Sequence, residues 1–420
     1  MSSARAQIEQ IYQAAIASVD PRTCVSSALS ATADEGSLVV DDVRIEVSEE
    51  GVYLIAIGKA GESMARGAVD ALGHHIRRGV VVTKTPVREL IEGFGYYVGA
   101  HPVPDERSLE SGGAVLDFAG RIPDGALVLC LISGGGSALV EALRPGIGLA
   151  DLQKATSLLL RGGAPIHDLN AVRSRLSRIK GGGLLTALHH TRVVNLIVSD
   201  VLGDDLHAIA SGPTVEPDLS TPAEDILKRY GVDLDLPDPG ATSVRAPVAT
   251  EIVANLGRAI GAAAAEATSI GLRPLLLADR LTGEAREVGA TIAAILAGSR
   301  HDLSPFSPGS CLLAGGETTV TVRGNGSGGR NTEAALAAAL ELRGSTGLTV
   351  GFLATDGDDG TSDAAGAIVD SATISQDETG PARRALDDND SVGFLSGTGA
   401  VWRPGATGTN VNDLVIGIVE

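Results

Sequence analysis

Short apolar runs alternate with helical patterns along most of the chain. Continuous apolar runs, typical of strands buried on both faces, predict strands at 52–57, 79–82, 127–132, 192–198, 274–278, 311–314, 348–354 and 413–419. Apolar residues three or four positions apart predict helices at 6–19, 108–118, 149–161, 166–179, 249–269, 283–297 and 331–342, with another ending at Leu72. Segments 43–47 and 318–322 also read as strands. This alternation predicts an α/β fold with a doubly wound, mostly parallel, Rossmann-like sheet.

One segment interrupts the pattern. Residues 231–247 are rich in Pro, Gly and Asp and lack apolar periodicity, which predicts a domain boundary. A chain of 420 residues with 44% hydrophobic content can form two separate cores. We therefore expect a Rossmann-like α/β domain at 1–240 and a second α/β domain at 241–420.

Three predicted strands of the first domain end in polar or glycine-rich residues. These ends are Gly58-Lys59, the run from Ser133 to Ser137, and Ser199-Asp200. Ligands of open parallel sheets bind outside the carboxyl ends of the strands. The three ends together therefore predict a site at this edge.

The middle strand end is a triple-glycine turn, Ser133-Gly134-Gly135-Gly136-Ser137. Glycines allow a tight turn and a close approach to a ligand. A helix beginning near Ser137 would direct its N–H groups and positive dipole end into the turn, which favours an anion such as phosphate. The alternative is a glycine-rich turn that binds nothing.

Several charged residues are suited to phosphoryl transfer. Lys59 can neutralise a phosphate, Asp200 can accept a hydroxyl proton, and Arg330 stands at a predicted helix start, where a cation is unfavourable unless an anion shares the site. Asp356 and Asp358 follow a buried strand and offer the oxygen ligands that Mg²⁺ prefers. The alternatives are a surface lysine, a helix cap at Asp200, and an Asp-Gly turn.

Two familiar nucleotide motifs do not explain the chain. Residues 324–329 fit G-x-G-x-x-G, but so glycine-rich a stretch matches by chance, and the preceding strand looks like part of an antiparallel hairpin. A Walker A motif at Gly58-Lys59 fails because Ala60 replaces the required Ser or Thr. Any nucleotide loop here is of neither common type.

Composition narrows the expected partners and compartment. The net charge of −19 disfavours nucleic acid and anionic membranes as partners. Three cysteines without metal-ligand spacing predict reduced thiols, buried at Cys130 and Cys311. With no signal peptide and no apolar run near 18 residues, a cytoplasmic protein is expected.

Several motifs, in this order, resemble the class II glycerate kinase family, whose C-terminal part is the MOFRL domain. They are Ser133-Gly-Gly-Gly-Ser137-Ala138-Leu139, Asn170-Ala-Val-Arg173 with Lys180-Gly181-Gly182, Ser199-Asp200-Val201-Leu202-Gly203-Asp204-Asp205, Ile209-Ala-Ser-Gly-Pro213-Thr214, Gly315-Gly316-Glu317-Thr318-Thr319-Val320, Gly328-Gly329-Arg330-Asn331, Thr355-Asp356-Gly357 and Thr407-Gly-Thr409-Asn410-Val-Asn412-Asp413-Leu414. The chain departs from the common family pattern at Thr332, usually Gln, and at Thr361-Ser362, usually Pro-Thr.

The resemblance implies transfer of the γ-phosphoryl group of ATP to D-glycerate, usually giving 2-phosphoglycerate. It implies catalytic roles for Lys59, Asp200 and Arg330 and a MOFRL-like region at about 308–415. Departures from the pattern lie beside these residues, so substrate preference is less firmly implied than reaction class.

We expect the site in a cleft between the two domains. The first domain would supply Lys59, the triple-glycine turn and Asp200, and the second would supply Arg330 and Mg²⁺ ligands at Asp356 and Asp358. Further nucleotide contacts are expected from Glu317 and Asn331.

Glycerate's carboxylate calls for a cation, and Arg173, Lys180 or Arg330 could serve. The sequence does not decide among the three. An NAD(P)-dependent hydroxypyruvate reductase and a non-catalytic sugar-acid-binding protein stay open as rival functions, and oligomeric state is not predicted.

Overall fold

The computed structural model describes residues 3–32, 36–40, 42–217, 222–238, 246–360 and 362–420. The chain forms two compact units, called here unit 1 (residues 1–20 and 254–420) and unit 2 (residues 21–253). These units do not coincide with the predicted domains, because the first helix packs on strands of the C-terminal half. Within the predicted boundary segment 231–247, residues 239–245 lie outside the described residues. Thr361, where the chain departs from the family pattern, also lies outside them.

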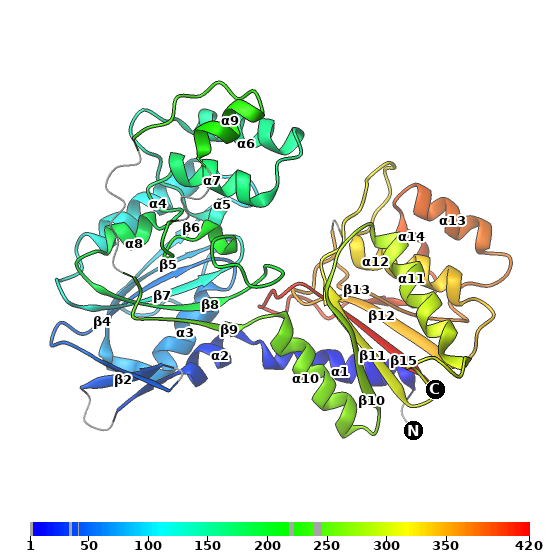
Figure 1. The fold of residues 1–420 in the computed structure, drawn as a ribbon. Coiled ribbons are helices and arrows are strands. Elements are labelled where there is room, and N and C mark those ends of the chain that lie inside the picture. The colour runs from blue at the N-terminus through cyan, green and yellow to red at the C-terminus, as the bar shows by residue number, and fades with distance from the viewer. Residues whose placement is uncertain (1–2, 33–35, 41, 218–221, 239–245, 361) are drawn as a thin grey trace. The chain divides into compact units, whose positions relative to one another are not determined.

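Unit 2 is built on a six-stranded sheet with the order β6-β5-β4-β7-β8-β9 (Figure 1). Its strands are β4 (Val52–Ile57), β5 (Ile76–Thr83), β6 (Phe94–Val98), β7 (Leu127–Ser133), β8 (Arg192–Val198) and β9 (Ala249–Ala254). The pairs β4–β5, β5–β6, β4–β7 and β7–β8 are parallel. The chain runs outward from β4 to β6 and returns to β7, so the strand order reverses between β4 and β7. This topology confirms the predicted doubly wound fold.

Helices cover both faces of this sheet. In Figure 1, α4 and α8 lie on one face and α2 and α3 on the other, while α6, α7 and α9 pack together around an apolar cluster of their own. The small sheet β1-β2-β3 is antiparallel. The bounds are α2 (Pro21–Ala28), β1 (Leu29–Ala31), β2 (Ser37–Val40), β3 (Val43–Glu46), α3 (Gly61–Leu72), η1 (Gly73–His75), α4 (Glu106–Ala119), α5 (Gly136–Leu139), α6 (Leu149–Arg161), α7 (Ile166–Leu176), α8 (Gly183–Ala187), η2 (Ile209–Ser211) and α9 (Ala223–Arg229).

Unit 1 contains a mixed six-stranded sheet with the order β10-β11-β15-β12-β13-β14. Only the β10–β11 pair is parallel. Helices α1 and α10 lie on one face and α11 and α12 on the other (Figure 1). The bounds are α1 (Ala4–Ser18), α10 (Leu256–Ser269), β10 (Arg273–Leu281), α11 (Ala285–Ala297), η3 (Gly298–Arg300), β11 (Ser310–Gly316), α12 (Arg330–Leu342), β12 (Leu348–Ala354), β13 (Gly366–Asp370), α13 (Thr379–Asp387), α14 (Ser391–Ser396), β14 (Val401–Trp402) and β15 (Asp413–Val419).

Two predicted elements are wrong, and a third is shorter than expected. The helix expected at 249–269 is strand β9 followed by α10, because Asn255 caps a new helix by accepting the Arg258 N–H at 2.9 Å. The strand expected at 318–322 is irregular apart from a single bridge at Thr319, so the hairpin inferred there does not form. The helix predicted to begin near Ser137 is present as α5, but it has only four residues, so few peptide dipoles add up at its start.

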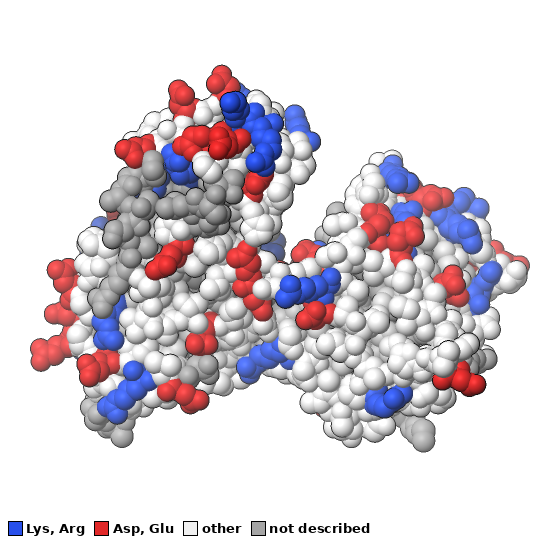
Figure 2. Space-filling view, viewed as in Figure 1, with Lys and Arg blue, Asp and Glu red and all other residues white. Residues whose placement is uncertain are grey.

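The structure shows where the cysteines and the surface charges lie. Cys24, Cys130 and Cys311 are buried thiols, as expected for the latter two. None of the helices in the described part of the chain is long and apolar enough to cross a membrane. On the face drawn in Figure 2, acidic and basic side chains lie interspersed over each unit.

Candidate active site

The first group of predicted site residues meets at the strand reversal of the unit 2 sheet. Lys59 follows β4 and the triple-glycine turn follows β7, its parallel neighbour. The Lys59 N–H donates to the Gly134 carbonyl at 2.9 Å, and the Ala60 N–H donates to Ser133 Oγ at 3.1 Å. The two strand ends are therefore bonded to each other at the point where α/β sheets bind their ligands.

Two glycines of this turn are required by their close neighbours. A Cβ on Gly134 would lie 1.8 Å from Asp200 Oδ2, so the Asp200 carboxylate rests directly against the turn. Gly135 has φ +81°, and a Cβ there would meet Lys59 Cγ at 3.1 Å and His101 Cδ2 at 3.2 Å. Lys59, Asp200 and the triple-glycine turn thus form one cluster, the switch-point cluster.

His101 also belongs to this cluster, although no motif around it points to a site. Its ring lies in the segment between β6 and α4, against Gly135. Burial, with the positive charges of Lys59 and Lys84 nearby, lowers the pKa of His101 from 6.5 to about 4. His101 is therefore a neutral imidazole at pH 7, able to donate and accept hydrogen bonds.

The far end of the triple-glycine turn is tied to helix α7. Ser137 Oγ lies 2.7 Å from Ser211 Oγ, and the Ser211 hydroxyl also donates to Asn170 Oδ1 at 3.0 Å. Asn170 is on α7, which also carries Arg173. Lys180, beyond α7, is buried and ion-paired with Glu141. The predicted substrate-binding cations therefore lie on the side of the turn formed by α7 and the residues after it.

A second group lies in unit 1, around the first residue of α12. The Arg330 guanidinium holds Asp413 with two hydrogen bonds, Nε to Oδ2 at 2.5 Å and Nη2 to Oδ1 at 3.0 Å, and bonds Glu317 Oε1 at 2.9 Å. Burial opposes the Arg330 charge, but Asp413 and Glu317 outweigh it and raise the pKa of Arg330. Burial raises the pKa of Asp413 to about 6, against the lowering effect of Arg330.

The anion expected at this helix end is supplied by the chain itself. Asp359 accepts the Asn331 N–H at 3.0 Å and the Thr332 N–H at 2.8 Å, and the Thr332 hydroxyl at 2.8 Å. Its carboxylate therefore caps α12 in the position a bound phosphate would take. Burial raises the pKa of Asp359 despite these hydrogen bonds. The charge argument for a ligand at Arg330 is correspondingly weaker.

The predicted magnesium ligands share one loop after β12. Asp356 Oδ1 accepts the Asp358 N–H at 3.1 Å, and the Asp358 side chain is exposed. No group of three or more His, Cys, Asp or Glu suited to a metal was found within the described part of the chain. Two carboxylates in one loop fit a Mg²⁺ ion that takes its remaining ligands from phosphates and water. They do not form a protein cage.

The glycine run at 324–329 is occupied by its own neighbours. The Asn325 N–H donates to Asp388 Oδ1 at 3.1 Å and the Ser327 N–H donates to Asp390 Oδ1 at 3.0 Å. A Cβ on Gly324 would lie 2.3 Å from the Asp388 carbonyl oxygen. Acidic side chains fill the place of a pyrophosphate, so this run gives no support to a dinucleotide site.

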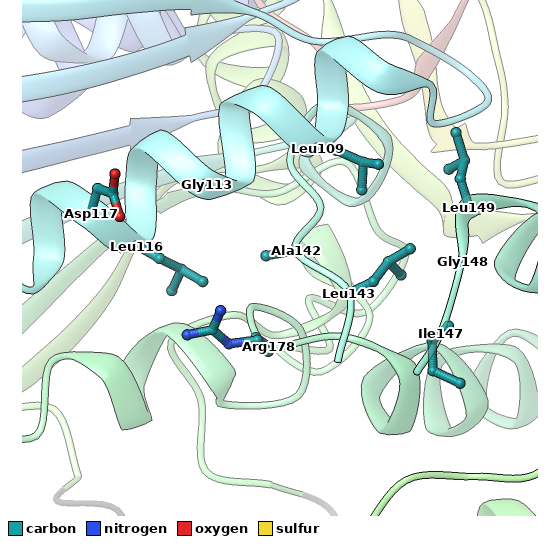
Figure 3. Close-up of a pocket in the computed structure, with 10 residues that line it drawn as sticks. All are labelled: Leu109, Gly113, Leu116, Asp117, Ala142, Leu143, Ile147, Gly148, Leu149 and Arg178. Carbon is teal, nitrogen blue, oxygen red and sulfur yellow. The ribbon is translucent and has the colours of Figure 1, made fainter. Parts of the chain in front are cut away.

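Unit 2 also has cavities away from the switch-point cluster. One of about 380 Å³ lies between α4 and the segment after α5 (Figure 3). In that view, the side chains of Leu116 and Arg178 project toward the space from opposite sides. A second cavity, of about 660 Å³, has Tyr53, Tyr97 and Phe118 among its lining residues. Neither cavity is lined by a predicted site residue.

Comparison with known proteins agrees with the motifs. Residues 7–244 match a domain of unknown function (DUF4147), and residues 310–413 match the MOFRL family. The chain is 41% identical to a D-glycerate 2-kinase of Thermotoga maritima over 90% of this chain and 93% of that protein. It is 38% identical to a provisionally named hydroxypyruvate reductase of Agrobacterium vitis, over 98% of this chain and 94% of that one.

A solved structure agrees as well. The crystal structure of a glycerate kinase from Thermotoga maritima superposes with a TM-score of 0.89 at 36% identity, covering 100% of both chains. The family matches, the sequence identity and the shared fold all indicate the same family, which confirms the resemblance seen in the motifs. The chain belongs to the class II glycerate kinase family, with its MOFRL domain in the C-terminal half.

Proposed function

We propose that this chain transfers the γ-phosphoryl group of ATP to a hydroxyl of D-glycerate, giving 2-phosphoglycerate. The observation that carries the proposal is the switch-point cluster, in which Lys59, the triple-glycine turn and Asp200 lie together at the reversal of a doubly wound sheet. A cation, a closely approachable backbone and a carboxylate are the groups that phosphoryl transfer needs.

The proposed reaction divides the work among these side chains. The acceptor oxygen of glycerate forms a bond to the γ-phosphorus as the bond to the bridging oxygen of ADP breaks. The hydroxyl proton passes to the Asp200 carboxylate, and the Lys59 ammonium balances charge on the transferring group. The neutral His101 beside Gly135 is placed to hold an oxygen of either substrate without adding charge.

Magnesium is part of the proposal. Asp356 and Asp358 would hold the ion through their free carboxylate oxygens, and the metal would supply charge neutralisation on the nucleotide phosphates. Predicted roles for Arg330, Glu317 and Asn331 and the predicted cleft between domains stay predictions. Arg330 in particular would have to exchange part of its pairing with Asp413 or Glu317 for a substrate oxygen.

A coupled assay of ADP release tests the function. The purified chain is given ATP, Mg²⁺ and a panel of hydroxy acids that includes both enantiomers of glycerate, and phosphorus NMR identifies the product. We expect ADP release that depends on D-glycerate and a resonance of a 2-phosphate ester. A 3-phosphate ester would correct the position of transfer, and the absence of D-glycerate-dependent ADP release would reject the kinase function.

The two rival functions give different results with the same protein. A hydroxypyruvate reductase consumes NADH or NADPH without ATP, which is followed at 340 nm. The name of the Agrobacterium vitis relative makes this a necessary control. A non-catalytic sugar-acid-binding protein binds glycerate in a calorimetric titration and releases no ADP.

A further inference from the structure

Two cations and one carboxylate lie together behind the triple-glycine turn, in what we call the Glu141 cluster: Glu141, Arg173 and Lys180. The Lys180 ammonium is ion-paired with Glu141 Oε2. The other oxygen, Oε1, accepts the Ser177 hydroxyl at 2.6 Å and the Ala142 N–H at 2.9 Å. Glu141 is 0% exposed and Lys180 3% exposed. Glu141 and Lys180 therefore satisfy each other inside the fold.

Arg173 is the cation of the Glu141 cluster that is not ion-paired with Glu141. Its side chain is partly buried, and within the described residues its guanidinium makes no hydrogen bond and no ion pair. Burial lowers the pKa of Arg173, and the charge of Glu141 only partly opposes this. Since Glu141 already neutralises Lys180, the cluster carries one excess positive charge. A partly buried charge without a partner is costly, which points to a second carboxylate supplied by a ligand.

Arg173 also lies on the face of α7 that meets the switch-point cluster. It is three residues after Asn170, so the two share one face of the helix. Asn170 is linked through Ser211 to Ser137 of the triple-glycine turn. A backbone hydrogen bond from the Gly181 N–H to the Ser211 carbonyl, 2.8 Å, fixes the same region beyond the helix. Arg173 therefore lies on the helix face whose Asn170 is linked to the turn, and its own guanidinium takes no part in that link.

The geometry points to Arg173 as the residue that binds the carboxylate of the acceptor hydroxy acid, an inference that rests on the proposed kinase function. The other two candidate cations are already committed, Lys180 to Glu141 and Arg330 to Asp413 and Glu317. Lys180 is a positioning residue that fixes Glu141 and the chain around Arg173. A planar guanidinium can hold both oxygens of a carboxylate at once.

The test uses the full chain and two substitutions, Arg173→Met and Arg173→Lys. D-glycerate binding is measured by calorimetric titration, and kcat/KM is measured for D-glycerate and for glycerol, which lacks the carboxylate. Arg173→Met should weaken glycerate binding by about 10²-fold, as expected for loss of charge-assisted hydrogen bonds. The preference for glycerate over glycerol should fall by a similar factor, with KM for ATP unchanged. The exposed Arg161 on α6 gives a matched control, Arg161→Met, which should behave as wild type.

Arg173→Lys decides the case if Arg173→Met does not fold. This variant keeps the positive charge but cannot hydrogen-bond both carboxylate oxygens at once, and it should weaken glycerate binding about 10-fold or more. Wild-type affinity in a folded Arg173 variant would overturn the inference while the kinase function stands. Wild-type protein that binds D-glycerate without releasing ADP would instead reject the kinase function, and the titrations would still show whether Arg173 holds the carboxylate.

Discussion

At the scale of single residues, Lys59 is the side chain whose loss should affect turnover most cleanly. It lies against Gly135 in the switch-point cluster. Removing one preorganised donor aimed at developing charge costs roughly 10²–10³ in turnover. We expect at least this loss of kcat for Lys59→Met, with an unchanged melting temperature, in the ADP-release assay. Lys59→Arg should recover little, because a guanidinium fork does not replace a compact ammonium.

The exposed Lys154 on α6 supplies the control for this change. Lys154→Met removes a lysine of the same unit and should leave both kcat and the melting temperature as in wild type. A Lys59→Met protein that turns over normally contradicts a role at the phosphoryl group, and one that fails only by unfolding makes Lys59 a packing residue.

His101 should make stability depend on pH in a defined direction. Its pKa is about 4 in the folded state against 6.5 for an unperturbed ring, so between these values the unfolded chain binds a proton that the fold does not. Stability from this group is therefore full above pH 6.5 and is lost as pH falls toward 4. Because the ring is only half buried, we expect a loss of about 1–2 kcal/mol.

Denaturant unfolding at pH 7 and pH 5 measures this effect. His101→Gln should be less sensitive to this drop in pH than wild type, since the titrating ring is gone. Identical pH dependence in the two proteins would show that His101 titrates as it does in the unfolded chain.

Lys180 should behave as a structural residue. Lys180→Met leaves Glu141 buried without its cation, and breaking such a pair costs about 3–5 kcal/mol of unfolding free energy. The matched variant carries both Lys180→Met and Glu141→Gln, and should recover much of that loss because no charge is stranded. If Lys180→Met keeps its stability and instead loses glycerate affinity, the Lys180–Glu141 pair matters for glycerate binding and not for the stability of the fold.

At the scale of elements, the triple-glycine turn is the part of the site with the least room for change. A Cβ on Gly134 would overlap the Asp200 carboxylate, so Gly134→Ala must displace one of them. Displacements near 1 Å can cost about 10² in rate, and we expect at least that loss in ADP release. Gly113→Ala is the control, since a Cβ there has no neighbour within 4 Å and lies on helix α4. Normal turnover of Gly134→Ala would mean that Asp200 does not act from its observed position.

Most strands could be predicted from the sequence because they are buried on both faces and leave a continuous apolar run, as in β7. Strand β9 could not, because Ala249–Ala254 runs into the alanine-rich pattern of α10 and only the Asn255 cap separates them. The short strand β13, Gly366–Asp370, could not, because its apolar run of three residues is too short to show a periodicity. Local pattern therefore gives the sheet centres better than their edges.

The residues of the candidate site also include some that the sequence predicts and some that it does not. Lys59, the triple-glycine turn and Asp200 could be predicted because the ends of parallel strands meet at one edge of a sheet. His101 could not, since it reaches Gly135 from a loop and no pattern around it is unusual. Asp413 lies 83 residues from Arg330 in the chain, so only the fold reveals that the arginine is already paired. Motifs identify candidate groups, whereas pairing decides which of them are free for a ligand.

At the scale of the whole molecule, unit 2 is one continuous segment inserted into unit 1. We expect residues 21–253 to fold alone and to melt cooperatively, because their sheet and apolar clusters lie within that segment. Residues 254–420 should not, because helix α1 buries Ile8, Ile11 and Tyr12 against this unit, and Tyr12 Oη donates to the Ala354 carbonyl at 2.8 Å.

Circular dichroism melts of the two fragments test this division. A version in which residues 1–20 are joined to residue 254 by a flexible linker should restore a cooperative melt to unit 1. If residues 254–420 melt cooperatively without it, α1 is an accessory helix and not part of the core.

The central position of β15 in its sheet also determines when unit 1 can complete its folding during synthesis. Asp413–Val419 lies between β11 and β12, yet it leaves the ribosome after every other strand described. At about 5–20 residues per second, roughly 20–80 s separate the emergence of α1 from that of the strand on which it packs. During that time α1 can already dock on α10, which emerges earlier, but the sheet of unit 1 still lacks its central strand, while unit 2 can already be complete. A chain released before residue 413 would carry a finished unit 2 beside a sheet split at its centre, and would be a natural client for chaperones and proteases.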